Sequence, residues 1–409
     1  MTPGAPSAPP LAGLRVLDLS RVLAGPLCTM MLGDLGADVL KVERPGTGDD
    51  TRQWGPPWAE GPGGRESAYY LSVNRNKRSV AADLKTEAGQ ALVRRLARDA
   101  DVVVENYAPG TLDGWGLGYE ALSELNPRLV FCSITGYGSD GPDAGLPGYD
   151  FAVQARAGWM SITGEAEGAP MKVGVALVDV LTGQNAAIAI LAALRERDAS
   201  GRGQRVEVAL FDSALAGLVN VAQAALVTGG EPRRWGNAHA TIVPYQTFQA
   251  ADRPFALAVG NDGQWRRLCG VLEADELAGD ARFATNPGRV ENRDALVPLL
   301  AERFRARTAA EWLARCEAAG VPCAPVQSVR EALADPVLAA RGGTWPMEGA
   351  TYGRVETLPS PLRFHRTPAR CLRPAPALGE HTAAVEREGW GDGAAPADGH
   401  PSPGDVRNA

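Results

Sequence analysis

Residues 14–43 of the 409-residue chain read LRVLDLSRVLAGPLCTMMLGDLGADVLKVE, and this stretch decides the fold class. The apolar run at residues 14–19 predicts a strand, and residues 38–43 predict a second one. Between the two runs, Pro26 suits the first turn of a helix, and Gly36 ends that helix. A strand, a helix and a second strand at this spacing predict a βαβ unit, in which the two strands run parallel.

The same alternation continues along the chain. Further strands are predicted at residues 79–84, 102–105, 129–135 and 205–210, and helices at residues 87–98, 119–125, 181–197 and 211–227. Residues 46–64 are rich in Gly, Pro and Trp without periodicity, so we expect a long loop there. Because buried strands alternate with helices, the expected fold is α/β, with a Rossmann-like parallel sheet covered by helices on both faces.

A polar, turn-rich connector at residues 229–234 predicts a domain boundary. The predicted large domain spans residues 11–225, a smaller α+β domain spans residues 236–326, and residues 327–385 return to complete the large domain. Within the small domain, Thr308 and Glu311 carry the sequence signature of a capping box at the start of a helix. Residues 1–10 and 391–409, rich in Pro, Ala and Gly, are expected to be disordered.

Composition limits the possible functions. Hydrophobic residues make up 45% of the chain, which is enough for a large core and excludes a wholly disordered protein. The net charge is −7 and the basic residues are dispersed, so binding to nucleic acid is not expected. The chain has neither an uninterrupted apolar run of about 20 residues nor the pattern of a signal peptide. We therefore expect a cytoplasmic protein that does not span a membrane.

Cysteine and histidine are too few and too scattered to form an obvious metal site. No two of the six cysteines have CxxC spacing, and none of the four histidines lies at zinc-site spacing from a cysteine or another histidine. The cysteines are expected to be reduced and the protein to hold no metal ion. Four histidines also make a Ser–His hydrolase improbable.

A glycine motif after the strand at residues 129–135 imitates a dinucleotide-binding turn. Gly136, Gly138 and Gly141 satisfy G-x-G-x-x-G, which has this meaning only where a helix begins directly after it. Pro142 and the glycines that follow it prevent such a helix. The sequence therefore does not predict NAD or FAD binding.

Polar and basic residues lie near several predicted strand ends. Arg44 follows the strand at residues 38–43, and Asn106 follows the strand at residues 102–105. Ligands of parallel sheets bind beyond the carboxyl ends of the strands, and a guanidinium grips phosphate well. A phosphorylated nucleotide is therefore one interpretation, and solvated turn charges are the alternative.

Asp179 ends the apolar run at residues 173–179 and precedes a predicted helix. A single carboxylate at such a junction is often an N-cap, which accepts hydrogen bonds from the first helical amides. The functional alternative is a nucleophilic or proton-transferring carboxylate in a pocket of low polarity.

Two further features admit a structural and a functional interpretation. Gly260 and Gly263 lie between a predicted strand and a helix, where they form either an ordinary turn or a flexible flap that offers amide donors. The aromatic residues Trp54, Trp58, Tyr69 and Tyr70 either wall an acyl chain or pack in the core.

Taken together, several blocks of the sequence resemble one family, the class III coenzyme A transferases. The resemblance covers about residues 11–376, and its blocks are LRVLDL (14–19), AGP (24–26), LGDLGADVLKVE (32–43), NKRS (76–79), ADVVVENYAPG (100–110), NPRL (126–129) and PGYD (147–150). The family includes formyl-CoA transferase and the carnitine-CoA transferase group, and the α-methylacyl-CoA racemases share its fold.

The resemblance implies a mechanism and a set of site residues. Asp179 would be the covalent nucleophile that takes an acyl group from acyl-CoA and passes CoA to an acceptor carboxylic acid, with no tightly bound cofactor and no metal. Gly260 and Gly263 would belong to a flap that closes over the acyl group. The positions matching CoA contacts are Leu23, Ala24, Arg44, Asn74, Arg75, Asn76, Lys77, Asn106, Tyr107, Ala108, Tyr149 and Asp150. The family also implies an interlocked homodimer.

The chain departs from parts of the family. The formyl-CoA transferase branch has Gln at Leu23, Arg near Gly114 and Lys near Pro147, so we expect an acid larger than formate and not oxalate. The racemase histidine corresponds to Tyr149, which is a poor base at neutral pH. A racemase-like enzyme and a non-catalytic acyl-CoA-binding protein remain the alternatives.

Overall fold

The computed structural model describes residues 8–391 and divides the chain into two compact units. The large unit contains residues 8–159, 173–223 and 339–391, and the small unit contains residues 160–172 and 224–338. The predicted disorder at the two ends of the chain concerns mostly residues 1–7 and 392–409, which lie outside the described residues.

The boundaries of the small unit differ from the predicted ones. It extends further at both ends than residues 236–326, and it takes in residues 160–172, which the sequence assigned to the large domain. Arg234 explains this assignment, because its guanidinium donates hydrogen bonds to the carbonyl oxygens of Ser161, Glu165 and Gly168.

A six-stranded parallel sheet forms the centre of the large unit, as predicted. The strands run in the order β5-β2-β1-β6-β7-β8, and Leu17 pairs with Leu40 on one side and Val103 on the other. They are β1 (Arg15–Asp18), β2 (Asp38–Glu43), β5 (Lys77–Ala81), β6 (Val102–Glu105), β7 (Val130–Thr135) and β8 (Arg205–Ala209). This is the doubly wound order 3-2-1-4-5-6, in which the chain reverses direction across the sheet between β1 and β6.

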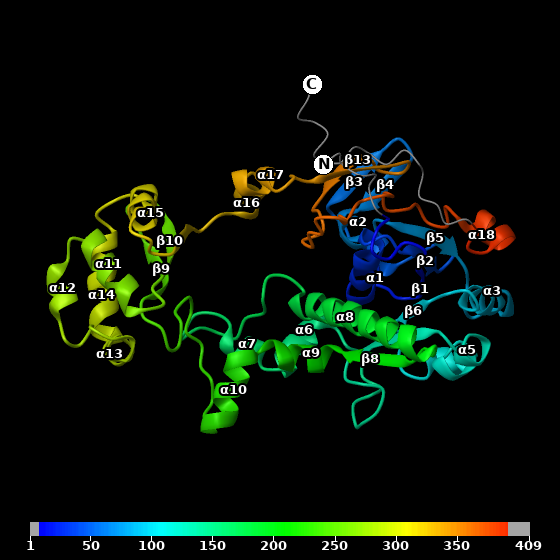
Figure 1. Ribbon diagram of the computed structural model, residues 1–409, viewed down its shortest axis with the longest axis horizontal. Helices are drawn as coiled ribbons and strands as arrows, with labels where there is room; N and C mark the ends of the chain where they lie inside the picture. Colours follow the sequence, from blue (N-terminus) through cyan, green and yellow to red (C-terminus); the bar gives the residue numbers. More distant parts are fainter. Residues whose placement is uncertain (1–7, 392–409) are drawn as a thin grey trace. The chain divides into compact units, whose positions relative to one another are not determined.

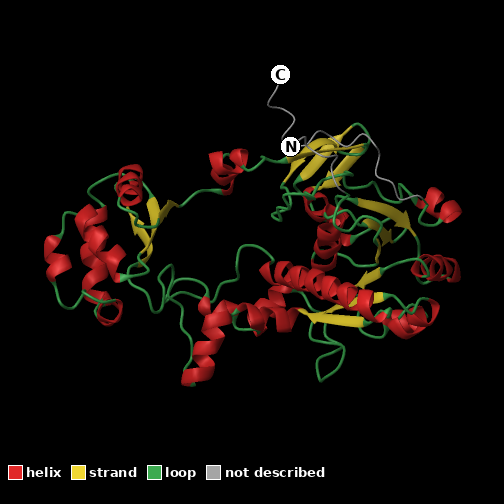
Figure 2. Cartoon of the chain, in the orientation of Figure 1, coloured by secondary structure: helices red, strands yellow, loops and turns green. Residues whose placement is uncertain are grey.

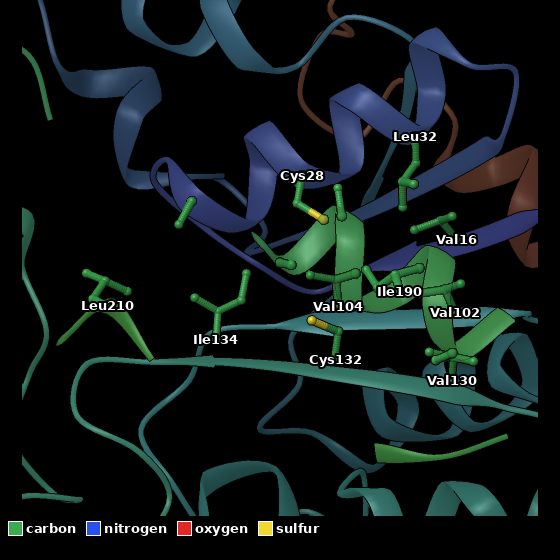
Figure 3. Packing of buried hydrophobic residues seen from close by; sticks show 14 of the residues in the cluster. Val16, Cys28, Leu32, Val102, Val104, Val130, Cys132, Ile134, Ile190 and Leu210 are labelled. Atoms are coloured by element: carbon green, nitrogen blue, oxygen red, sulfur yellow. The ribbon is translucent and has the colours of Figure 1, made fainter. Parts of the chain in front are cut away.

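Two long helices cover one face of this sheet. α1 (Ala24–Asp34) packs against α8 (Leu177–Ser200), and Figure 1 shows the two helices side by side. The core beneath them consists of small and branched apolar side chains. Figure 3 shows Cys28 and Leu32 of α1 and Ile190 of α8 close to valines of the central strands. Their burial explains the run of apolar residues in each strand.

The other face is covered by α3 (Glu87–Ala97), α5 (Tyr119–Leu125) and the C-terminal α18 (Thr382–Glu388). The remaining helices are α2 (Ala68–Val73), α4 (Thr111–Gly114), α6 (Asp150–Arg156), α7 (Trp159–Ile162), α9 (Leu210–Gly217), α10 (Val219–Thr228) and α17 (Pro336–Ala340). The unit boundaries fall within α7, α10 and α17.

The C-terminal part of the chain returns to the large unit. The hairpin β12 (Trp345–Gly349)–β13 (Gly353–Thr357) packs beside the hairpin β3 (Trp58–Gly61)–β4 (Gly64–Ser67), where Gly61 meets the backbone of Tyr352. Figures 1 and 2 show the two hairpins together, although almost 300 residues separate them in the chain.

Three local predictions were wrong. Residues 46–64 contain a 3-10 turn, η1 (Asp50–Gln53), and most of the β3–β4 hairpin instead of one long loop. The predicted helix at residues 211–227 is two helices, α9 and α10, with a 77° bend between them. α8 begins at Leu177, four residues before its predicted start, so that Asp179 lies within the helix.

The small unit combines helices with a three-stranded antiparallel sheet of order β11-β10-β9. Its elements are β9 (Tyr245–Gln249), β10 (Pro254–Ala258), β11 (Cys323–Pro325), α11 (Asp262–Val271), α12 (Asp275–Gly279), α13 (Asn286–Glu291), α14 (Arg293–Phe304), α15 (Ala309–Ala318) and α16 (Val329–Leu333). The predicted capping box is present, because Thr308 and Glu311 exchange hydrogen bonds at the start of α15.

α8 is the one helix in residues 8–391 that is by itself long and apolar enough to cross a membrane. Forty-four per cent of its apolar window is buried within the protein. Core helices of water-soluble proteins have the same length and composition, so this helix is weak evidence for a membrane span.

Candidate active site

Asp179 is the third residue of α8, in the first turn of the helix. The residue before the helix, Ala176, makes no side-chain cap, so the first helical amides need another acceptor. The predicted N-cap interpretation of Asp179 is therefore wrong, because Asp179 lies inside the helix. Its half-buried carboxylate is left available for chemistry.

Asp150, the first residue of α6, supplies the missing acceptor. Its Oδ2 accepts hydrogen bonds from the backbone amides of Val178 at 2.8 Å and Asp179 at 3.3 Å. Gln154 donates to its Oδ1 at 2.6 Å, and the side chain is almost fully buried. Asp150 was predicted to contact CoA, but its carboxylate is already occupied by these three donors. The structure therefore assigns it to the start of α8.

The surroundings change the acidity of Asp179. Burial, and after it the negative charge of Asp150, raise the pKa of Asp179 to about 7. A carboxyl group whose pKa is raised in this way is more basic than a solvated one, and it still ionises near neutral pH. Perturbed carboxylates of this kind are concentrated at active sites.

Tyr69 of α2 shares this environment. Burial and the charges of Asp179, Asp150 and Asp49 raise its pKa to about 12. Its ring packs edge-on against Trp54, with 5.2 Å between the ring centroids. Two of the four predicted aromatic wall residues therefore lie together, and one of them is near the carboxylates. Tyr70 is instead fully buried under Arg52.

A cavity of about 230 Å³ lies beyond the carboxyl ends of β1 and β2. It is lined by Ser20, Arg21, Lys41, Val42, Glu43, Arg44, Gly48, Asp49, Ala82, Asp83, Leu84, Lys85, Tyr107 and Trp115. The position agrees with the rule that ligands of doubly wound sheets bind where the strand order reverses. Arg44 and Tyr107, both predicted from the sequence, lie in its wall.

Arg44 does not act alone in this cavity. Asp50 bridges two guanidinium groups, pairing with Arg44 through Oδ1 and with Arg21 at 3.0 Å through Oδ2. Arg21 also stacks on Tyr107, at 5.3 Å from the ring centroid, and its Nε is buried without a hydrogen-bond partner. Two guanidinium groups held by one carboxylate are suited to bind a phosphate group in its place.

Asn106 was predicted to contact CoA, and the structure gives its side chain another role. The amide accepts a hydrogen bond from the Arg21 backbone N–H at 2.9 Å and donates one to the Arg21 carbonyl at 2.8 Å. Val22, which follows Arg21, has a φ of 71°, a strained backbone conformation for a residue with a branched side chain. Its N–H donates a hydrogen bond to the Asp49 carboxylate. Asn106 thus holds the turn that presents Arg21.

This turn leads into α1, which packs against α8. Leu23 is half-buried at the start of α1, and Ala24 is buried. A Cβ on Gly183, one turn after Asp179, would lie 2.6 Å from the Ala24 carbonyl oxygen. The turn at the switch point therefore connects the basic cavity with the first turns of α8.

Asn74 to Lys77 stay predicted CoA contacts, and in the structure their side chains bind other parts of the protein. They lie at the amino end of β5, not at a carboxyl end, and all four are buried. Asn74 donates to the Tyr70 carbonyl, Arg75 pairs with Asp34, Asn76 bonds to Asp34 and the return segment, and Lys77 pairs with Asp18. The sequence also placed these residues before a strand, and their CoA contacts were implied by the family resemblance alone.

The other predicted contacts are exposed. Ala108 lies just after Asn106 in the loop that follows β6, and Tyr149 is exposed immediately before α6. Tyr149 and Ala108 therefore belong to surfaces that a ligand can reach, and they remain predicted CoA contacts.

Gly260 and Gly263 lie in the small unit, and the structure does not give them the predicted glycine-dependent turn. Neither has a positive φ, and Gly263 is the second residue of α11. Asn261 caps this helix by accepting from the Gln264 amide at 2.9 Å, while Gly260 donates to the Gln264 side chain at 2.7 Å. The segment is a capped helix start, and its role as a flap over the acyl group stays a prediction.

Sequence reasoning missed Arg21, Asp50 and Gln154 as site residues. Arg21 could have been found, because it lies three residues after β1, beyond the carboxyl end of a strand next to the switch point. Asp50 and Gln154 carry no local signal, since each acts through a partner that only the fold brings near.

Residues 8–391 contain no group of three His, Cys, Asp or Glu side chains that could hold a metal ion. The six cysteines are free thiols, four of them buried. The charged side chains that lie together here are arginines, lysines and carboxylates, which suit anion binding and carboxylate chemistry.

The fold and the site together are typical of an α/β enzyme with an anion-binding cavity and a carboxyl group of raised pKa. Comparison with known proteins then identifies the family. The model of the family described as CoA-transferase family III matches residues 11–382. The chain therefore belongs to this family.

Individual relatives cover nearly the whole chain. It is 47% identical over 382 residues to the succinate–glutarate CoA-transferase of Agrobacterium fabrum, covering 93% of this chain and 96% of that protein. It is 43% identical over 379 residues to the succinyl-CoA:glutarate CoA-transferase of Homo sapiens, covering 93% and 86%. A crystal structure of a CaiB/BaiF family protein from Brucella suis matches with a TM-score of 0.83 and 46% identity, covering 93% of this chain and all of that one.

The protein is accordingly an enzyme, a class III CoA-transferase that moves CoA between an acyl-CoA and a carboxylic acid. The interpretation as a non-catalytic acyl-CoA-binding protein is wrong. The racemase alternative also gives way, because the relatives are named as transferases.

Proposed function

We propose that this enzyme transfers CoA between short dicarboxylic acids through covalent intermediates on Asp179. Two relatives that are 47% and 43% identical carry names with succinate, succinyl-CoA and glutarate. The single observation that carries the mechanism is the half-buried, basic carboxylate of Asp179 in the first turn of α8.

In the first half-reaction, an Asp179 oxygen attacks the thioester carbonyl carbon. The C–S bond breaks, and the products are an acyl-aspartyl anhydride and the CoA thiolate. The thiolate then attacks the Asp179 carbonyl carbon of the anhydride. The donor acid leaves as a carboxylate, and an aspartyl-CoA thioester remains.

In the second half-reaction, the acceptor carboxylate attacks the aspartyl thioester and again releases CoA thiolate. The thiolate attacks the acceptor's acyl carbon in the new anhydride, which forms the product acyl-CoA and restores the Asp179 carboxylate. No proton must be moved by a histidine in either half, and each difficult step is divided into two easier ones.

Arg44 and Arg21 are proposed to bind phosphate groups of CoA at the carboxyl ends of β2 and β1. Support comes from the two guanidinium groups in one cavity and from the buried, unpaired Nε of Arg21. Tyr107 offers an aromatic surface in the same cavity.

We also propose the remaining predicted properties. A homodimer, interlocked as in the family, is supported by apolar residues that the chain leaves exposed, such as Ile188 on α8 and Leu226 on α10, with exposed fractions of 65% and 80%. That the protein has no tightly bound cofactor stays a prediction from the resemblance. That it has no nucleic-acid or membrane partner and a cytoplasmic location stays a prediction from composition.

The test is mass spectrometry of the enzyme after incubation with succinyl-CoA, together with an assay of CoA transfer to glutarate. We expect a covalent adduct on the peptide that contains Asp179. Asp179→Ala should lose the adduct and at least about 10³-fold of the activity. Asp212→Asn, an exposed acid of α9, is the matched control and should retain both.

Full transfer activity in Asp179→Ala, with no adduct on the wild type, would rule out the covalent mechanism. A panel of donor thioesters and acceptor acids tests the substrate class separately. Faster transfer to monocarboxylic acids than to glutarate and succinate would contradict the proposed dicarboxylate preference.

A further inference from the structure

Two carboxylates meet at the start of α8, and one of them has no step in the mechanism above. Asp150 comes from α6, is 9% exposed and accepts the amides of Val178 and Asp179. Gln154 fixes its direction, because its Nε2 donates to Asp150 while its Oε1 accepts the Val173 amide at 2.9 Å. This bridge aims Asp150 at the helix start.

We propose that Asp150 is a positioning residue that keeps Asp179 a strong nucleophile, by occupying the first amides of α8 and by facing Asp179 with a second negative charge. The proposal rests on the proposed function, because it takes Asp179 as the nucleophile.

The occupied amides preserve the basicity of Asp179. The free N–H groups at a helix start stabilise a nearby anion, and a carboxylate that receives them becomes less basic. Here the amides of Val178 and Asp179 are taken by Asp150. Asp179 therefore lies in the first turn of a helix without losing its basicity to these donors. A more basic carboxylate is a better nucleophile.

The negative charge of Asp150 also acts on Asp179. Two carboxylates at one site repel each other, and the repulsion raises the free energy of the ionised pair. Acylation of Asp179 converts its carboxylate into an uncharged anhydride, so the repulsion disappears in that step. Asp150 thus favours the covalent intermediate relative to the free enzyme.

Other charged groups around α8 do not replace Asp150. Tyr69 of α2 is near both carboxylates, but its raised pKa keeps it neutral at physiological pH. On the elements packed against α8, the remaining titratable or charged groups are Asp34 of α1, Arg156 of α6, Asp212 of α9, and Arg205 and Glu207 of β8, besides the buried thiols Cys28 and Cys132. Asp34 is paired with Arg75, Arg156 with Asp143, and Arg205 with Glu207.

The test compares Asp150→Asn with the wild type in the rate of Asp179 acylation by succinyl-CoA, measured over a pH range. The wild type should lose activity as the pH falls through about 7, because Asp179 becomes protonated. In Asp150→Asn, the midpoint of this loss should move to lower pH by about one unit, and the rate on the alkaline plateau should fall about three- to tenfold.

Three further variants separate charge from structure. Asp150→Ser keeps an acceptor for the helix amides without the charge, and it should shift the pH midpoint in the same direction. Gln154→Ala removes the bridge but no charge, so its rate should fall with little shift of the midpoint. Asp212→Asn should leave both quantities unchanged.

An unchanged midpoint in both Asp150 variants would overturn the proposal, as would a wild-type midpoint near pH 4. The wild-type midpoint is measured without any variant, so it tests the proposal even if the Asp150 variants do not fold. An adduct on Asp179 with an unchanged midpoint refutes the role of Asp150 alone, whereas full activity of Asp179→Ala refutes the proposed function.

Discussion

Asp50 is a single residue that decides what two arginines can bind. Its carboxylate pairs with both Arg21 and Arg44 at the rim of the basic cavity. A phosphate group that binds these guanidinium groups must replace Asp50 or share the arginines with it. Asp50 therefore preorganises the two side chains and competes with the ligand at the same time.

At the residue scale we predict that Asp50→Asn tightens CoA binding about two- to fivefold at low salt, because a partly exposed ion pair contributes little energy of its own. Isothermal titration with CoA and with 3′-dephospho-CoA measures the effect and shows which phosphate is involved. Asp83→Asn removes a negative charge from the cavity wall without touching either arginine pair, and it should change binding less. Weaker CoA binding in Asp50→Asn than in Asp83→Asn would show that Asp50 only orients the two arginines and does not compete with the ligand.

The sequence predicted site residues where the signal is local. Arg44 follows its strand directly, and the structure places it in a cavity at the expected end of the sheet. Asp150, a predicted CoA contact, is also the acceptor at the start of α8, which the sequence could not show because the hydrogen bond reaches 28 residues along the chain. The buried ion pair of Lys77 with Asp18 could not be predicted, because it leaves no trace in the pattern of the sequence.

At the scale of elements, the approach of α1 to α8 depends on one glycine. A Cβ on Gly183 would lie 2.6 Å from the carbonyl oxygen of Ala24, a backbone atom that cannot move without shifting α1. This contact holds the turn at the switch point against the helix that carries Asp179. Close packing of the two helices is thus tied to the geometry of the site.

We predict that Gly183→Ala lowers the free energy of unfolding by about 1–3 kcal/mol, although alanine is the better helix former. Urea denaturation measures this change, and the KM for acyl-CoA should rise with it. Gly270→Ala in α11 is the control, since a Cβ there meets nothing within 4 Å and should stabilise by up to about 1 kcal/mol. A stabilising Gly183→Ala would show that α1 can move aside freely.

Element types could be predicted well where periodicity and turn residues agree. The six strands of the central sheet lie within about two residues of their predicted positions at most ends, because buried parallel strands are short apolar runs bounded by glycine or polar residues. The break between α9 and α10 lies at Leu218, directly after Gly217, and a single glycine inside an otherwise helical apolar pattern was not enough to predict it. The β3–β4 hairpin owes its place to β13, which is distant in the sequence.

At the scale of the whole molecule, the C-terminal return segment is fastened to the sheet by a few polar side chains. Asn76 donates to the carbonyl of Arg370 at 2.8 Å and accepts from the amides of Leu372 at 2.6 Å and Arg373 at 3.0 Å. Its Nδ2 also donates to Asp34 at 2.8 Å. One side chain at the amino end of β5 therefore satisfies three backbone groups nearly 300 residues away. Unsatisfied, these groups would be costly to bury.

The backbone conformation of Asn76 allows the loss of its side-chain hydrogen bonds to be measured separately from backbone strain. Its φ is 62°, in the left-handed region that asparagine and glycine tolerate and alanine does not. Asn76→Gly removes the hydrogen bonds alone, and we expect it to lower the free energy of unfolding by about 2–3 kcal/mol. Asn76→Ala should cost about 1 kcal/mol more, because it adds strain. Both variants should be cleaved faster by protease within residues 339–391, while residues 224–338 of the small unit keep their protection. Equal stability of the wild type and Asn76→Gly would mean that the return segment is held by its apolar contacts, with Ala375 and Trp390 as the anchors.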